Sequence, residues 1–147
     1  MARSPWVKHG WRATFYFTPG GLTTSLIPDG DGGIEVQFDF VNHTVLGHCG
    51  SGKTESFPLS PMSVADSHSH LIGMIKVLGG VATFHGSRNE LEDPMLFAED
   101  MASRPYDSDA VTRFHRALVT VSHVFQEFRT GYRGKVSPVH LFWGSFD

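Results

Sequence analysis

The sequence lacks several features that mark specialised classes of protein. It contains one cysteine, Cys49, which excludes an intramolecular disulfide and a cysteine-based zinc site and fits a reducing compartment. No stretch approaches the run of about 18 apolar residues that a membrane-spanning helix needs. The N-terminus also lacks the apolar segment of a signal peptide. We therefore expect a cytoplasmic protein with no membrane association.

Positive charge is scarce as well. Lys and Arg total 12 against 15 Asp and Glu, which gives a formal net charge of −3, and the basic residues are scattered. A nucleic-acid-binding surface needs a basic patch, so we expect no nucleic-acid partner. The chain is 40% hydrophobic and 18% charged, an ordinary globular composition. Its length suits one domain over residues 1–147.

Phenylalanine and histidine are plentiful by contrast. The 12 Phe predict a core built on aromatic side chains, and the chain also carries nine His. Histidine titrates near neutral pH and ligates metals, so one hypothesis is that some of the nine histidines are functional.

Strand patterns separated by turns occupy the first half of the chain. Apolar and polar residues alternate from His9 to Thr18, as in a half-buried strand. Residues 34–41 alternate in the same way, with Asp39 on the outward face and an inward set of Ile34, Val36, Phe38 and Phe40. Three further segments read as strands with their turns, namely "TPGGLTTSLIP", "HTVLGHC" and "KTESFPL".

The segment "GHCGSGKT" (47–54) matches the phosphate-binding P-loop pattern G-x-x-x-x-G-K-[ST]. A P-loop works only where a helix starts directly after it, because the helix N-terminus holds the phosphates. Pro58 and Pro61 follow here, and a proline inside a helix costs about 3 kcal/mol. We therefore interpret the segment as a glycine-rich hairpin turn. The chain is not expected to be a P-loop NTPase.

Helical patterns dominate the second half. Ser63 and Asp66 form an acidic variant of the capping box, and Gly79-Gly80 ends the helix that they begin. "VATFHG" (81–86) predicts a short strand. A longer helix is expected from about Asp107 to Tyr132, with an apolar stripe of Val111, Phe114, Leu118, Val121, Phe125 and Phe128. The predicted fold is α+β, an antiparallel meander sheet followed by helix-strand-helix, with the helices packed on one face of the sheet.

Two groups of histidines were weighed as metal ligands. "DSHSH" (66–70) resembles the D-x-H-x-H motif of amidohydrolases, but on a helix His68 and His70 diverge by about 200°. Those enzymes also need a barrel of about 250 residues. His115 and His123 stand about 12 Å apart on the longer helix, too far for one ion, and are expected at a surface or an interface. We expect neither a metal nor a cofactor.

The run "GKVSPVHLFWGSFD" (134–147) sets polar residues among large apolar ones. Polar groups in such surroundings must be hydrogen-bonded or they destabilise the fold. Lys135, Ser137 and His140 therefore belong either to a satisfied network at the edge of the core or to a site with acid–base or nucleophilic chemistry. The spacing alone favours the structural interpretation.

The chain resembles an uncharacterised bacterial family, the domain of unknown function numbered 5996. The resemblance rests on "WVKHGW" (6–11), "TPGGLTTS" (18–25), "FDFVNH" (38–43), "SVAD" (63–66), "VFQEFR" (124–129) and residues 134–147. It implies no known activity. It also implies that members are about twice as long, so that this chain would be their central part. Apolar surface left by missing flanks would then favour self-association into a homo-oligomer.

Polar and aromatic residues within the matched segments are the candidate site. We assign Asp39, His43, Ser137 and His140 as candidate catalytic residues, and His9, Trp11, Lys135 and Trp143 as candidate ligand-binding residues. The first hypothesis is a small-molecule hydrolase with His and Asp as acid and base, and with Ser137 or water as nucleophile, although no G-x-S-x-G elbow is present. The alternative is a non-catalytic ligand-binding or dimerisation domain. A His/Asp metal site is a third possibility.

Overall fold

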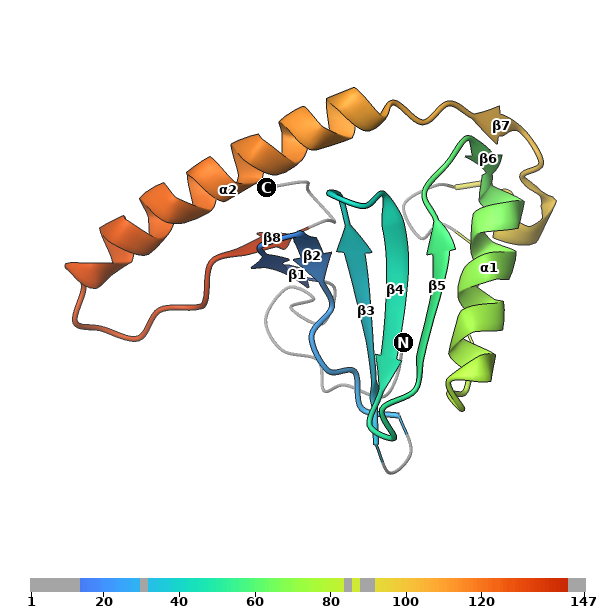
Figure 1. Cartoon of the computed structure of the whole chain (residues 1–147), viewed down its shortest axis with the longest axis horizontal. Coiled ribbons are helices and arrows are strands. Elements are labelled where there is room, and N and C mark those ends of the chain that lie inside the picture. The colour runs from blue at the N-terminus through green and yellow to red at the C-terminus, as the bar shows by residue number, and fades with distance from the viewer. Residues whose placement is uncertain (1–13, 30–31, 84–85, 88–91, 143–147) are drawn as a thin grey trace.

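A six-stranded antiparallel sheet organises the molecule (Figure 1). The computed structural model describes residues 14–29, 32–83, 86–87 and 92–142. The strand order is β5-β4-β3-β2-β1-β8, so five consecutive strands form a meander and β8 returns from the end of the chain to pair with β1. This confirms the α+β class and the meander. The strands are β1 (Thr14–Thr18), β2 (Gly21–Thr23), β3 (Ile34–Asp39), β4 (Thr44–Cys49), β5 (Thr54–Pro58) and β8 (His140–Phe142).

The strand register gives the sheet one apolar and one polar face. Leu22, Phe38, Val45 and Phe57 lie directly opposite one another on successive strands, so they share a face. Ile34 and Val36 point the same way as Phe38 because side chains alternate along a strand. Thr23 lies on the other face, where its hydroxyl donates a hydrogen bond to Glu35. The predicted alternation of β3 is therefore confirmed from Ile34 to Phe38, but Asp39, which was expected to face outward, is buried.

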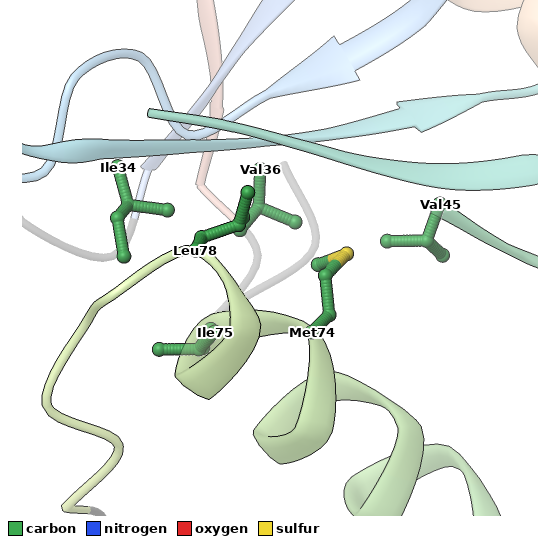
Figure 2. Close-up of a cluster of buried hydrophobic side chains, with 6 residues drawn as sticks. All are labelled: Ile34, Val36, Val45, Met74, Ile75 and Leu78. Atoms are coloured by element: carbon green, nitrogen blue, oxygen red, sulfur yellow. The ribbon is translucent and has the colours of Figure 1, made fainter. Parts of the chain in front are cut away.

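Helix α1 (Val64–Val77) covers the apolar face over β3 and β4. Figure 2 shows its Met74 and Ile75, together with Leu78 just beyond its end, directed toward Ile34, Val36 and Val45. The predicted start is confirmed, since Ser63 Oγ accepts from the Asp66 backbone N–H and the Asp66 carboxylate accepts from the Ser63 N–H. Gly47 lets the helix approach closely, because a Cβ there would lie 2.6 Å from Leu78 Cδ1.

The P-loop lookalike is a β-hairpin, as predicted. Residues 44–58 form β4, a tight turn and β5, and Gly52 adopts a positive φ of 83° in that turn. Lys53 donates from Nζ to the Val77 carbonyl oxygen at 2.8 Å, at the C-terminal end of α1. A positive side chain suits that end of a helix, whereas a P-loop presents phosphate to a helix N-terminus. The lysine of this motif therefore caps a helix.

The connection between the helices differs from the prediction in one place. Residues 81–83 form no strand, and residues 84–85 lie outside the described part of the chain. The strand between the helices is instead β7 (Ser103–Arg104), which pairs with β6 (Met62–Ser63) directly before α1. A 3₁₀ turn, η2 (Phe97–Glu99), precedes it, and the Phe97 ring packs on His68. Pairing with the start of α1 explains why the strand forms there.

Helix α2 (Ser108–Thr130) crosses one end of the sheet, and its C-terminal half extends past the sheet (Figure 1). Asp107 is its N-cap and accepts from the Ala110 N–H at 2.9 Å, which confirms one of the two predicted caps. Phe114 and His115 pack on Phe40, which follows β3 in the same alternating series as Ile34 and Val36. Within the described ranges no helix is both long and apolar enough to cross a bilayer.

Candidate functional site

The turn between β3 and β4 gathers several of the predicted polar residues. Asp39 Oδ1 accepts hydrogen bonds from the backbone N–H groups of Val41 and Asn42, and Oδ2 accepts from the Asn42 side chain at 2.8 Å. Burial alone would raise the pKa of Asp39. These hydrogen bonds and the nearby His115 together lower it by more than burial raises it, so the pKa lies below its usual value. Asp39 is thus an ionised carboxylate that holds the turn together.

His43 ends the same turn with a positive φ of 54°, and its Nδ1 lies 2.8 Å from the Tyr106 hydroxyl. Burial raises the pKa of Tyr106, so the phenol keeps its proton at neutral pH and can donate it to Nδ1. The contact joins the hairpin to the segment that leads into α2. The sequence placed His43 in a site but did not identify this partner.

His115 is the histidine that the structure places differently from expectation. It lies on the face of α2 that packs against the hairpin and is 9% exposed, whereas the sequence predicted a surface or interface position. Its ring packs on Phe40, and among the described residues Nε2 has no hydrogen-bond partner. Its charged form would interact favourably with Asp39, which connects α2 electrostatically to the turn.

The remaining predicted catalytic residues lie at the β8 edge of the sheet. His140 begins β8, where its Nδ1 lies 2.8 Å from the Pro138 carbonyl oxygen and its ring packs edge-on against Tyr16. Ser137 is half-buried in the loop before this strand, and Lys135 is exposed in the same loop. These residues belong to the rim formed by β8 and β1.

The structure therefore divides the predicted catalytic residues into two pairs. Strands β1 and β2 separate His140 on β8 from Asp39 on β3. Three strand spacings of about 4.8 Å put the two pairs roughly 14 Å apart, too far for a shared proton transfer. His9, Trp11 and Trp143, which we assigned to ligand binding, lie outside the described residues. Among those described, no group of three or more His, Cys, Asp or Glu is placed to hold a metal ion.

Two small hollows lie away from these pairs. One, of about 230 Å³, is apolar and lies between α1 and η2, lined by Val64, Ser67, His68, Leu71 and Phe97. The other, of about 210 Å³, is lined by glycines of three segments (32–33, 50 and 79–80) together with Cys49 and Ser51. Both are smaller than the roughly 300–1,000 Å³ of ordinary small-molecule sites.

Cys49 lines the second hollow and is the free thiol of the chain. The Ser51 hydroxyl lies 3.1 Å from its Sγ and lowers the pKa of the thiol, with smaller contributions from Lys53. A lower pKa increases the thiolate fraction at neutral pH, and the thiolate is the nucleophile. Sequence reasoning used Cys49 only to exclude disulfides and missed this environment, because a hairpin was needed to bring Ser51 back beside it.

We expect Ser51→Ala to slow the alkylation of Cys49 by iodoacetamide at pH 7. Loss of the hydroxyl lets the pKa of the thiol rise toward its ordinary value, so less thiolate is present. Above that ordinary value both proteins are fully ionised, and the difference should shrink. Mass spectrometry against pH measures both rates, with Ser60→Ala as the control. A rate difference that stays constant with pH would contradict this explanation.

A further unpredicted feature is apolar side chains left exposed on α2. Val121, Val124, Phe125 and Phe128, with Tyr132 just beyond the helix, expose between 45% and 81% of their surface. We name these five residues the α2 stripe. The sequence predicted Val121, Phe125 and Phe128 on the apolar side of a helix packed against the sheet. A 23-residue helix is about 35 Å long, however, and the sheet is about 24 Å wide. The excess length extends past the sheet and has no strands to cover.

The comparison with known families agrees with the resemblance that the sequence suggested. No curated protein and no solved structure matches the chain. The model of one family, described as a family of unknown function (DUF5996), matches residues 1–147. Since the match takes in every residue, the expectation that the chain represents only a central part of the family is not borne out. The chain belongs to the DUF5996 family.

Proposed function

We propose that this chain is a non-catalytic assembly domain, in which the sheet and α1 form a scaffold and α2 presents the binding surface. The observation that carries the proposal is the exposure of the α2 stripe. Isolated exposed apolar residues are common. Four neighbours on one side of a helix and a tyrosine just beyond its end, three of the five being aromatic, are typical of an interaction surface. Aromatic side chains also dominate the energetics of such surfaces.

The hydrogen bonds of the polar residues support the same view. Asp39 holds the hairpin turn, His43 connects this turn to Tyr106, and His140 contacts the Pro138 carbonyl at another edge of the sheet. Catalysis by acid and base requires the two groups to reach one substrate together. Positions roughly 14 Å apart favour structural roles for these residues instead.

The test of an assembly role is Phe128→Ser. This side chain is 81% exposed, so its loss should change the melting temperature by no more than about 2 °C. The same change should weaken self-association by about tenfold or more, as for an aromatic residue central to an interface. Sedimentation over a concentration series measures association. Melting is measured on dilute protein, because association raises apparent stability.

The matched control is His123→Ser, an exposed position on the opposite side of the same helix. It introduces the same serine and the same small loss of helix propensity, and association should be unchanged. A drop of many degrees in Phe128→Ser alone would mean that the stripe packs within the chain. Equal association of both variants and the original protein would exclude the stripe as the binding surface.

A small-molecule hydrolase is the second candidate, favoured by one observation. The Tyr106 hydroxyl orients the His43 ring, much as a catalytic base is oriented by a neighbouring group. Ser137 precedes β8, away from His43, so water would have to be the nucleophile. His43 would be its base at Nε2 in the tautomer whose Nδ1–H donates to the Tyr106 oxygen. Ester hydrolysis that His43→Ala abolishes and Val41→Ala preserves would place this candidate first.

A further inference from the structure

We propose that the partner of the α2 stripe is the same stripe of a second copy, packed antiparallel about a two-fold axis near Phe125. This inference rests on the proposed function and adds to it the partner and the geometry.

The stripe has enough area for a self-contact. The exposed parts of Phe125, Phe128 and Tyr132 together equal about two complete aromatic side chains, or roughly 400 Å². Val121 and Val124 add roughly 100 Å². Two copies would therefore bury up to roughly 1,000 Å² of mainly apolar surface, which reaches the lower end of the range for biological interfaces. The same stripe on both chains satisfies the self-complementarity that a two-fold interface requires.

The spacing of the stripe suits packing against another helix. Positions 118, 121, 125, 128 and 132 follow alternating steps of three and four residues, the seam of a coiled-coil-like contact. The neighbouring positions His115 and Ser122 are buried against the chain's own fold, so one flank of the seam is already occupied. The flank that carries Val124 is open, and a second helix can pack there.

The attachment of α2 favours the antiparallel orientation. Its first half is held to the sheet through Phe114 and His115 on Phe40, while its second half extends past the sheet (Figure 1). Antiparallel packing brings only the two extending halves together and sends the two sheets to opposite ends of the pair. Parallel packing would place both sheets at the same end. Opposed helix dipoles also attract, whereas parallel ones repel.

A centre at Phe125 makes a specific geometric prediction. Phe125 would meet its own copy, because a residue on the axis of a two-fold interface faces itself. Val121 would face position 129 of the second copy, and its own copy would lie about 12 Å away along the helices. Disulfides require Cα atoms within about 7 Å, so they distinguish the two positions.

Disulfide trapping tests this geometry. Phe125→Cys and Val121→Cys are each made in a Cys49→Ser background, which leaves one thiol per chain. Both variants are oxidised with diamide and run on a non-reducing gel beside sedimentation of the unoxidised protein. We expect a covalent dimer from Phe125→Cys, none from Val121→Cys, and a dimer in sedimentation that Phe128→Ser removes. Phe125→Cys removes an aromatic side chain from the interface and weakens the contact. The disulfide is covalent, so it still accumulates from a weakened contact.

Each other outcome overturns part of the proposal in a distinguishable way. Covalent dimers from both variants would mean parallel packing. A dimer in sedimentation that requires Phe128 but gives no disulfide at position 125 would overturn the geometry and leave the assembly function standing. Association into larger particles through the stripe would overturn the two-fold contact alone. A chain that stays monomeric at the highest attainable concentration would overturn both the second copy as partner and assembly by self-association.

Discussion

Val45→Asp is expected to abolish folding. Val45 is 1% exposed and lies on β4 among Ile34, Val36, the α1 residue Met74 and Leu78 just beyond α1 (Figure 2). A carboxylate there has no cation or donor in that cluster, and an unpaired buried charge costs at least about 4 kcal/mol. Small domains have only about 5–15 kcal/mol of stability in total. Circular dichroism against temperature should show no cooperative transition.

Val41→Asp is the matched control for this experiment. Val41 belongs to the turn between β3 and β4, four residues before Val45, and is 61% exposed. The same substitution there leaves the new carboxylate in water, and the Val41 backbone N–H can still donate to Asp39. We expect a change in stability of no more than about 0.5 kcal/mol. A fold that survives Val45→Asp with a cooperative transition would show that this cluster is not the core.

Gly21→Ala is expected to have the next largest effect. Gly21 begins β2, and a Cβ added to it would overlap the backbone carbonyl oxygen of Phe38 and lie 3.2 Å from the Phe40 ring. A backbone oxygen in a sheet cannot move aside as a flexible side chain can. The strands β2 and β3 must therefore separate locally, at a cost of about 1–3 kcal/mol or more. Thermal melts should show a loss of several degrees.

The preceding glycine provides the control. A Cβ at Gly20 would lie 3.5 Å from the nearest atom, Asp39 Oδ1, which is an ordinary contact distance. Gly20→Ala changes the same atoms in the same turn, and we expect stability to stay within about 1 kcal/mol of the original protein. If the two alanine variants melted at the same temperature, the close approach of β2 to β3 would not be what requires Gly21.

The sequence could not predict which of the candidate polar residues lie close together in the fold. Asp39 and His43 were grouped with Ser137 and His140 because all four stand in segments that resemble one family. The strand order then put β1 and β2 between the two pairs. This strand order cannot be predicted from patterns of neighbouring residues, because β8 pairs with β1 across more than 120 residues. The Tyr106 contact with His43 likewise joins positions 63 residues apart.

The sequence alone specified the elements whose stabilising interactions are local. The alternation of residues 34–38, the capping box of Ser63 and Asp66, the cap at Asp107 and the prolines after Thr54 all act within a few residues, so their effects could be predicted. The tertiary structure decided what depends on distant contacts. It placed Lys53 on the end of α1 and buried His115. It also left the α2 stripe exposed, because helical spacing defines an apolar side of a helix but not whether the sheet is wide enough to cover it.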